Sequence, residues 1–331
     1  MSRLRVGVIG VGKMAEICHL PILAGLPQVE LAAFCDSSPD NLAARSEQYG
    51  VQRRYSDHHA LFDGERLDAV CIFVPPFAHT DAEILAAQRG IHVFVEKPPA
   101  LSMEKAREVN SAIEKARIVS AVGFQERYRR AVGAAKERLA GKRPIQGLIH
   151  RLHGSRAAAY WWMIEKLSGG AFVENTIHSV DLLRYLAGDF TSVSCRIVER
   201  PDKTPELDIP LAHSATFTLA AGGVATVNNC TALGGYSHTQ FLLVGGESLF
   251  DLSGKKLLIN GQEVAEDEPG RAAYEREFAT FFDAIIESDP QRVLSPYRDG
   301  MRSLAAVLGA VDSARRGGEA VDLTKPPYSA P

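Results

Sequence analysis

A short glycine-rich stretch near the start of the chain constrains its fold more than any other feature. In residues 4–9 the apolar side chains of Leu4, Val6 and Val8 alternate with their neighbours, and Ile9 ends an apolar run, as expected for a buried strand. Gly10 and Gly12 come next. A helical pattern then begins, in which the small Ala15 allows close packing against the strand. Gly10 permits a tight turn, and Gly12 lets backbone amides approach a pyrophosphate at the helix N-terminus. This context predicts a dinucleotide-binding turn; the alternative is an ordinary glycine-rich turn.

Strand and helix patterns alternate through the first third of the chain and then give way to successive strands. Further strands of the first region are expected at residues 29–35, 68–74, 91–95 and 119–124. From residue 192 to 259, runs with a period of two follow one another without helices between them, and two helices are expected at 271–287 and 299–316. Alternation with helices predicts a parallel sheet of the α/β class, whereas successive strands predict an α+β domain with antiparallel pairing.

The composition excludes several classes of function. The chain has 331 residues, enough for two domains, and a net charge of −3 gives no basic surface for nucleic acid or an anionic membrane. No apolar stretch approaches the roughly 18 residues of a membrane span, and the N-terminus does not resemble a signal peptide. The five cysteines are scattered without CxxC spacing, as is typical of a reducing compartment. We expect a cytoplasmic protein that binds neither nucleic acid nor membrane.

Asp36 closes the second predicted strand, where a carboxylate can accept hydrogen bonds from the ribose hydroxyls of a dinucleotide. It would repel a 2′-phosphate, and no arginine follows it directly. NAD is therefore favoured over NADP. The alternative is that Asp36-Ser37-Ser38-Pro39 only caps a helix.

Glu96-Lys97-Pro98 stands at the carboxyl end of the fourth predicted strand, the edge at which open parallel sheets bind ligands. A lysine ammonium there can hydrogen-bond a substrate oxygen, pass a proton or stabilise a developing alkoxide. A solvated surface charge is the alternative for Lys97.

A third candidate constellation lies on the helix expected after Gly169-Gly170. At 100° per residue, one narrow face carries Glu174, His178, Asp181 and Tyr185. A histidine flanked by carboxylates is suited to act as a general base. The alternative is a solvent-facing stripe of an amphipathic helix. A metal shared by Glu174 and His178 lacks a third ligand at suitable spacing, so no metal is expected.

Two further groups are candidate substrate contacts. The aromatic run before this helix can stack on a sugar face or exclude water, or it can simply pack in the core; it consists of Tyr160, Trp161 and Trp162. A second group follows the fifth predicted strand at the ligand-binding edge of the sheet and consists of Gln125, Arg127 and Tyr128.

Over nearly its whole length the chain resembles the glucose–fructose oxidoreductase/inositol dehydrogenase (Gfo/Idh/MocA) superfamily. The resemblance rests on the Gly-x-Gly-x-x-Ala turn, on Val74-Pro75-Pro76 with His79, on Glu96-Lys97-Pro98, and on Gly169-Gly170 with His178 and Asp181. It implies a Rossmann NAD-binding domain, expected at residues 1–123, and an α+β domain at residues 124–331 with a large, open, mostly antiparallel sheet for substrate binding and oligomerisation. Lys97 and His178 fall on the family's catalytic positions. Glu174 stands where many members carry Asp, and Thr176 where Gly is common.

The resemblance implies an NAD-dependent oxidoreductase that acts on a secondary alcohol or ketone of a sugar, polyol or derivative. His178 takes the hydroxyl proton, Lys97 polarises that oxygen, and Glu174 or Asp181 orients the histidine. The expected cofactor contacts are Gly10, Gly12, Lys13, Met14, Asp36, Ser37, Pro75, His79, Glu96, Lys97 and Gln125. The alternatives are an NAD-dependent glycosidase on the same scaffold and a non-catalytic NAD-binding sensor. Because the open sheet needs covering, a homodimer or homotetramer is expected.

Overall fold

The computed structural model of the protein describes residues 3–154 and 159–329. By its internal contacts the chain divides into two compact units. The first comprises Met1–Ala100, Glu104–Gln125 and Gly270–Tyr297, and the second comprises Leu101–Met103, Glu126–Pro269 and Arg298–Pro331.

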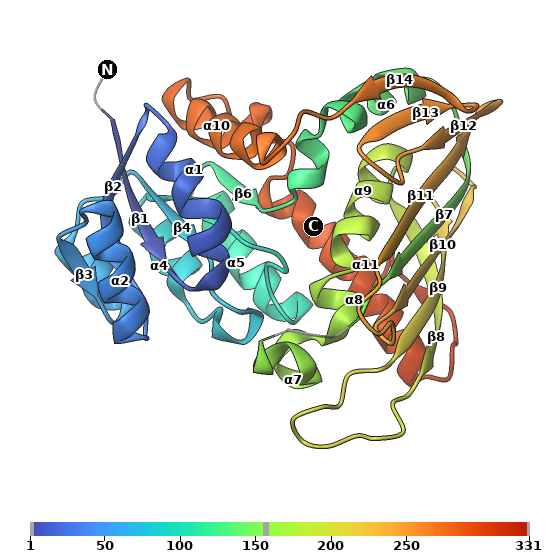
Figure 1. Cartoon of the computed structure of the whole chain (residues 1–331), viewed down its shortest axis with the longest axis horizontal. Helices are drawn as coiled ribbons and strands as arrows, with labels where there is room; N and C mark the ends of the chain where they lie inside the picture. Colours follow the sequence, from blue (N-terminus) through green and yellow to red (C-terminus); the bar gives the residue numbers. More distant parts are fainter. Residues whose placement is uncertain (1–2, 155–158, 330–331) are drawn as a thin grey trace. The chain divides into compact units, whose positions relative to one another are not determined.

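The first unit is a six-stranded parallel sheet in the order β3-β2-β1-β4-β5-β6 (Figure 1). Its strands are β1 Leu4–Ile9, β2 Val29–Cys35, β3 Arg53–Tyr55, β4 Ala69–Ile72, β5 His92–Val95 and β6 Ser120–Val122. Its helices are α1 Leu20–Gly25, α2 Pro39–Tyr49, α3 His58–Gly64, α4 Ala82–Gln88, α5 Met103–Ala116 and α10 Ala272–Ile286. The order reverses between β1 and β4, which is the point where doubly wound sheets bind dinucleotides. This confirms the expected Rossmann sheet.

Local chemistry explains why these elements form where the sequence predicts them. Ser38 caps α2 by accepting a hydrogen bond from the Asn41 amide, Pro39 occupies the first turn, and Gly50 ends the helix in the left-handed conformation. The short edge strand β3 was not expected, because its Arg-Arg-Tyr sequence carries no apolar alternation.

Helix α10 packs in the first unit, although it follows the second in sequence. Its buried residues Phe278, Phe281 and Phe282 belong to the same apolar cluster as Val6 of β1 and Phe94 of β5. Figure 1 shows α10 beside α1, and the two helices are in contact. The expected division at residues 123 and 124 therefore differs from the observed one for this segment, because helical periodicity does not reveal which sheet a helix covers.

The second unit is built on a nine-stranded sheet in the order β14-β13-β12-β11-β7-β10-β9-β8-β15. Its strands are β7 Pro144–Leu152, β8 Phe190–Val198, β9 Ala212–Leu219, β10 Val224–Cys230, β11 His238–Gly245, β12 Ser248–Asp251, β13 Lys256–Ile259, β14 Gln262–Glu266 and β15 Val321–Asp322. All pairs are antiparallel except β7 with β10. Its helices, which lie on one face of the sheet in Figure 1, are α6 Arg130–Leu139, α7 Glu165–Ser168, α8 Gly170–Glu174, α9 Ile177–Ala187 and α11 Tyr297–Arg315. This confirms the expected mostly antiparallel sheet.

The single helix expected after Gly169-Gly170 is two helices. The carbonyl of Ala171 accepts hydrogen bonds from the amides of both Asn175 and Thr176, so α8 ends there. The carbonyl of Thr176 then accepts from Ser179 and Val180, which begins α9. Glu174 and His178 consequently lie on different helices, and the 100° spacing that aligned them does not apply.

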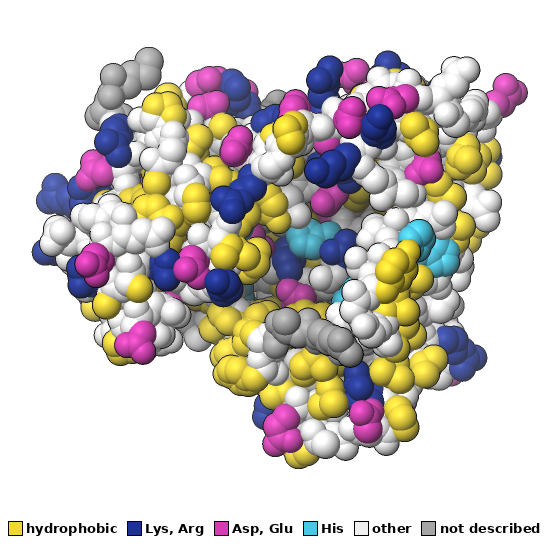
Figure 2. Space-filling model, viewed as in Figure 1, with side chains coloured by type: hydrophobic (Ala, Val, Ile, Leu, Met, Phe, Trp, Pro, Cys, Tyr) yellow, Lys and Arg dark blue, Asp and Glu magenta, His cyan; other side chains and the backbone are white. Residues whose placement is uncertain are grey.

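Charged side chains of both signs lie on the face shown in Figure 2. Basic and acidic side chains are interspersed over it, in keeping with the small net charge. Within residues 3–154 and 159–329, no helix combines the length and the apolar character needed to cross a membrane.

Candidate active site

The glycine turn after β1 is shaped by close approach to the neighbouring strand connection. Gly10 has φ +88°, and a Cβ on it would lie 2.8 Å from the carbonyl carbon of Phe73. Only glycine fits both the conformation and the contact. At Gly12 a Cβ would meet nothing closer than 3.9 Å, so the backbone there is open to a ligand.

Asp36 is attached to this turn by backbone hydrogen bonds. Its Oδ2 accepts from the amide of Val11 and its Oδ1 accepts from the amide of Ser38, both at 2.8 Å. Each carboxylate oxygen keeps a second lone pair for a ribose hydroxyl. The exposed residues around the turn are Lys13, Met14 and Ser37. Gly10, Gly12 and Asp36 therefore fit an NAD-type dinucleotide, with its pyrophosphate over the turn and a ribose at Asp36.

The connection after β4 is held by a buried pair. His79 Nδ1 lies 2.6 Å from Glu83 Oε1, and the two side chains are 3% and 1% exposed. The His79 ring is thus held through Nδ1 at the turn that begins at Pro75, where a cofactor contact of His79 is expected. Pro75 itself is half-buried.

Lys97 directly follows β5 at the carboxyl edge of the same sheet. Because the strand order is β1-β4-β5, this edge is separated from the glycine turn by one strand only. Glu96, an expected cofactor contact, turns inward instead: its Oε1 lies 3.0 Å from Nε2 of buried His19, and its Oε2 accepts the Lys97 amide at 3.0 Å. Gln125, half-buried, begins a 3₁₀ turn after β6 at this edge.

In the second unit, Glu174 and Trp162 form a buried pair. The indole Nε1 of Trp162 donates to Glu174 Oε2, and both residues are nine-tenths buried or more. Trp162, with half-buried Trp161 and Met163, packs against Ala171 and Ile209. The indole thus holds the carboxylate in place, while Tyr160 is 71% exposed. His178 is half-buried in the first turn of α9.

Asp181, expected to orient His178, and Arg127, an expected substrate contact, form a buried ion pair. The two side chains are fully buried and bond bidentately, from Arg127 Nε to Asp181 Oδ2 at 2.8 Å and from Nη2 to Oδ1. Ser303 also donates to Oδ1 at 2.6 Å, and Arg127 reaches Asp299. Asp181 therefore anchors α9, and Arg127 is engaged in this network rather than placed for substrate. Tyr128 is likewise buried, at 6% exposed.

Two residues near Glu174 were not expected from the sequence: Arg151 of β7, and His153, which follows the end of that strand. The Nε of Arg151 donates to Asn175, the neighbour of Glu174, and the His153 ring lies 5.9 Å from that of Trp162. Burial lowers the pKa of His153, nearby Arg151 lowers it further, and Glu174 opposes both. The only sequence signal was the strand alternation, which, continued one residue past β7, gives His153 the same side as Arg151.

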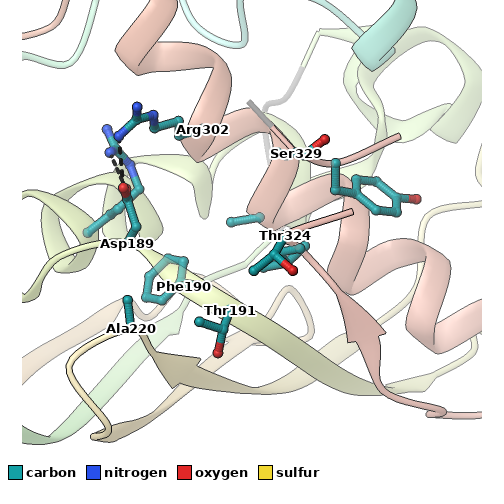
Figure 3. A pocket seen from close by; sticks show the side chains of 12 residues that line it. Asp189, Phe190, Thr191, Ala220, Arg302, Thr324 and Ser329 are labelled. Carbon is teal, nitrogen blue, oxygen red and sulfur yellow. Dashed lines mark hydrogen bonds and ion pairs between the residues drawn. The ribbon is translucent and has the colours of Figure 1, made fainter. Parts of the chain in front are cut away.

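A cavity of about 300 Å³ lies elsewhere in the second unit, between α9, β8, α11 and the C-terminal segment (Figure 3). Asp189 bridges Arg184 and Arg302 at its edge, at 2.8 Å from each. None of the site residues expected from the sequence is among its described lining residues.

A doubly wound sheet with an open glycine turn and a carboxylate at the end of β2 defines an NAD-binding oxidoreductase. Residues 4–124 match the model of an oxidoreductase family with an NAD-binding Rossmann fold, and residues 143–249 match the GFO/IDH/MocA C-terminal domain. The chain belongs to the GFO/IDH/MocA oxidoreductase family. This confirms the family, the enzyme class and the NAD cofactor expected from the sequence.

The chain is similar to several named dehydrogenases. It is 30% identical over 232 residues to the scyllo-inositol 2-dehydrogenase (NAD(+)) of Bacillus subtilis, covering 67% of this chain and 66% of that protein. It is 26% identical over 328 residues to the myo-inositol 2-dehydrogenase of Thermotoga maritima, covering 92% and 94%. The solved structure of a levoglucosan dehydrogenase with NADH has the same fold, with a TM-score of 0.84 at 22% identity over 97% of this chain and 99% of that one.

Proposed function

We propose that the protein is an NAD-dependent dehydrogenase of a secondary alcohol in a cyclic polyol or sugar. The observation that carries this proposal is the placement of Lys97 at the sheet edge that also bears the glycine turn and Asp36. The named relatives, which are dehydrogenases of inositols and of levoglucosan, support this substrate class. A cyclic polyol presents adjacent hydroxyl groups, which suit the polar cluster of Arg151, His153 and Glu174 in the second unit.

Each residue has a proposed role in the reaction. Lys97 hydrogen-bonds the reacting oxygen and stabilises its developing negative charge, and His178 accepts the hydroxyl proton. Glu174, held by Trp162, is the carboxylate proposed to act with His178, because Asp181 is committed to Arg127 and Ser303. When bound, NAD accepts the hydride from the substrate carbon.

The test is a panel of scyllo-inositol, myo-inositol, levoglucosan and D-apiose with NAD, followed by nicotinamide absorbance. We expect turnover with at least one, and tighter calorimetric binding of NAD than of NADP because Asp36 repels a 2′-phosphate. Tighter binding of NADP would contradict the role of Asp36. If no polyol or sugar is turned over, with either NAD or NADP, the proposed substrate class is contradicted.

The catalytic roles are tested with Lys97→Ala and His178→Asn on the best substrate. Each should lower kcat by about a hundredfold or more while NAD still binds. In His178→Asn the fall in oxidation rate at low pH should also disappear, since that fall reports protonation of the base. Near-normal turnover in either variant would remove that residue from the mechanism.

We propose that the protein works as a homo-oligomer in the cytoplasm. The outer face of the nine-stranded sheet, which no described helix covers, supports the first part. The second part is supported by the cysteines, which are free thiols throughout.

A further inference from the structure

A buried histidine–glutamate pair lies beneath Lys97 in the first unit and has no part in the mechanism above. The His19 side chain is 1% exposed, and its Nε2 lies 3.0 Å from Glu96 Oε1. Glu96 Oε2 accepts the backbone amide of Lys97 at 3.0 Å. One carboxylate thus joins the helix that follows the glycine turn to the residue that we propose as catalytic.

The surrounding structure is built to receive this carboxylate. A Cβ on Gly123 would lie 3.1 Å from Glu96 Oε1, so the glycine leaves room for the carboxylate against the backbone of the neighbouring strand. The His19 ring stacks on Phe73 with ring centres 4.2 Å apart, and the edges of Tyr274 and Phe278 close its other sides.

The backbone is irregular at the point where His19 enters the pair. Residues Ala15–His19 form a π-helical turn between the glycine turn and α1. Such turns are rare and occur frequently at functional sites. The extra residue in the turn changes the direction of the side chains that follow, and here His19 points into the sheet edge at Glu96.

The carboxylate is kept charged in spite of its burial. Burial raises the pKa of Glu96, but contact with His19, and then the charge and amide of Lys97, more than offset it, so the pKa stands below its ordinary value. The other ionisable groups of this region are Cys18 on the same turn and Arg271, Tyr274 and Glu277 around α10. Glu96 is therefore an anion that accepts one main-chain amide and has one imidazole nitrogen in close contact.

We infer that His19 is a positioning residue: it orients the Glu96 carboxylate, which fixes the main chain of Lys97 and hence the origin of its side chain. This inference rests on the catalytic role proposed for Lys97. A displacement of about 1 Å at a catalytic group can cost roughly a hundredfold in rate, so the pair matters even though it touches no reacting atom.

The test compares His19→Phe, which keeps the stacking ring but removes both nitrogens, with His19→Gln, which keeps a donor. We expect His19→Phe to lower kcat about tenfold or more while KM and NAD binding change little, and His19→Gln to recover part of the loss. Glu96 should titrate at higher pH in His19→Phe, because it then loses the partner that keeps it ionised, whereas the low-pH fall in rate, which reports His178, should not move. Carbon NMR of labelled glutamate should show the same upward shift of the Glu96 titration without any substrate.

A double-mutant cycle with Glu96→Gln shows whether His19 acts through Glu96. We expect the double variant His19→Phe/Glu96→Gln to be no slower than Glu96→Gln alone. His92→Gln is the matched control, since His92 is a histidine at the opposite end of the same strand, β5, where it accepts the Val119 amide. It should lower the melting temperature without changing kcat or the Glu96 titration.

An unchanged kcat together with an unchanged Glu96 titration in His19→Phe would overturn the inference, as would independent, multiplying effects in the cycle. If His19→Phe does not fold, Glu96→Gln alone decides: it should lower kcat by the same factor, and wild-type rates would overturn the inference. Lys97→Ala is measured alongside. If it is inactive while His19→Phe is normal, only the positioning role fails; if it is active, the proposed function of Lys97 fails.

Discussion

Burial alone sets the charge of one histidine in the second unit. His213 of β9 is 5% exposed, and its ring stacks on Phe172 with ring centres 5.0 Å apart. Burial lowers its pKa to about 4, against smaller opposing effects of Asn229 and Glu199. An unperturbed histidine, as in the unfolded chain, titrates near pH 6.5. Between about pH 6.5 and pH 4, His213 is therefore neutral in the folded protein but mostly protonated in the unfolded chain.

The direction of the stability change follows from these two values. Below about pH 6.5 the unfolded state binds a proton that the folded state does not, so the free energy of unfolding falls by up to about 1.4 kcal/mol per pH unit until about pH 4. We expect His213→Phe to reduce this acid-side loss, measured by urea unfolding from pH 7 to 4.5 at fixed protein concentration. Both tryptophans lie in the second unit and report its unfolding. The exposed His238, replaced by Gln, should leave the pH dependence unchanged; an unaltered dependence in His213→Phe would contradict the prediction.

At the scale of elements, a charged network joins three segments of the second unit. Arg127, from the 3₁₀ turn Gln125–Tyr128, bonds Asp181 of α9 and Asp299 of α11, and Arg184 of α9 bonds Asp299 as well. Burial lowers the pKa of Arg127, but the two aspartates more than offset it and the pKa stands raised. Asp299 shows the converse: burial raises its pKa, and Arg127 and Arg184 bring it below its ordinary value. The network fixes α9, and with it the backbone that carries His178.

We expect Arg127→Met to destabilise the second unit by about 3–5 kcal/mol, because it leaves the buried carboxylate of Asp181 without its ionic partner. Arg302→Met on α11 is the control: Arg302 bonds Asp189 at the surface, with side chains 39% and 44% exposed, and such pairs contribute about 1 kcal/mol or less. Urea unfolding followed by tryptophan fluorescence compares the two. Equal losses in the free energy of unfolding would contradict the prediction that the buried network stabilises the unit more than the surface pair.

At the scale of the whole molecule, the outer face of the nine-stranded sheet carries an apolar surface, and no described helix covers it. Two cross-strand rows define it by their register: Thr218, Val224, Gln146, Val244 and Leu249, and beside them Thr216, Thr226, Leu148, Leu242, Asp251 and Leu258. Both rows mix apolar and polar side chains, and Val224 and Leu249 are 43% and 39% exposed. A second copy of the chain, related by two-fold symmetry, is the simplest partner for such a face.

We therefore expect a dimer or tetramer in light scattering at micromolar concentration, and dissociation of that assembly by Val224→Glu or Leu148→Glu. Ile286→Glu on α10 is the matched control, since Ile286 is 42% exposed but lies in the first unit. A wild-type protein that is monomeric at this concentration would rule the interface out.

The sequence by itself determined the features that depend on neighbours along the chain. Gly10 is required by a tight turn, Ser38 and Pro39 by the first turn of a helix, and Asp36 by its place at the end of a strand; each follows from local backbone geometry. The period-two alternation of apolar and polar side chains also depends only on neighbouring residues, and it distinguished the mostly antiparallel sheet of the second unit from the parallel sheet of the first. Motif spacing also led to the family, because the glycine turn and Glu96-Lys97-Pro98 stand at strand ends.

Only the tertiary structure decided which groups meet across the chain. Asp181 stood on the expected face of a helix, but its charge is compensated by Arg127 and Ser303, which are distant in sequence. Glu96 was expected to contact the cofactor, whereas its burial required His19 as a partner. Helix α10 completes the first unit because its phenylalanines fill that core. A buried charge or an apolar face needs a partner of matching chemistry, and periodicity shows that need without showing which distant residue meets it.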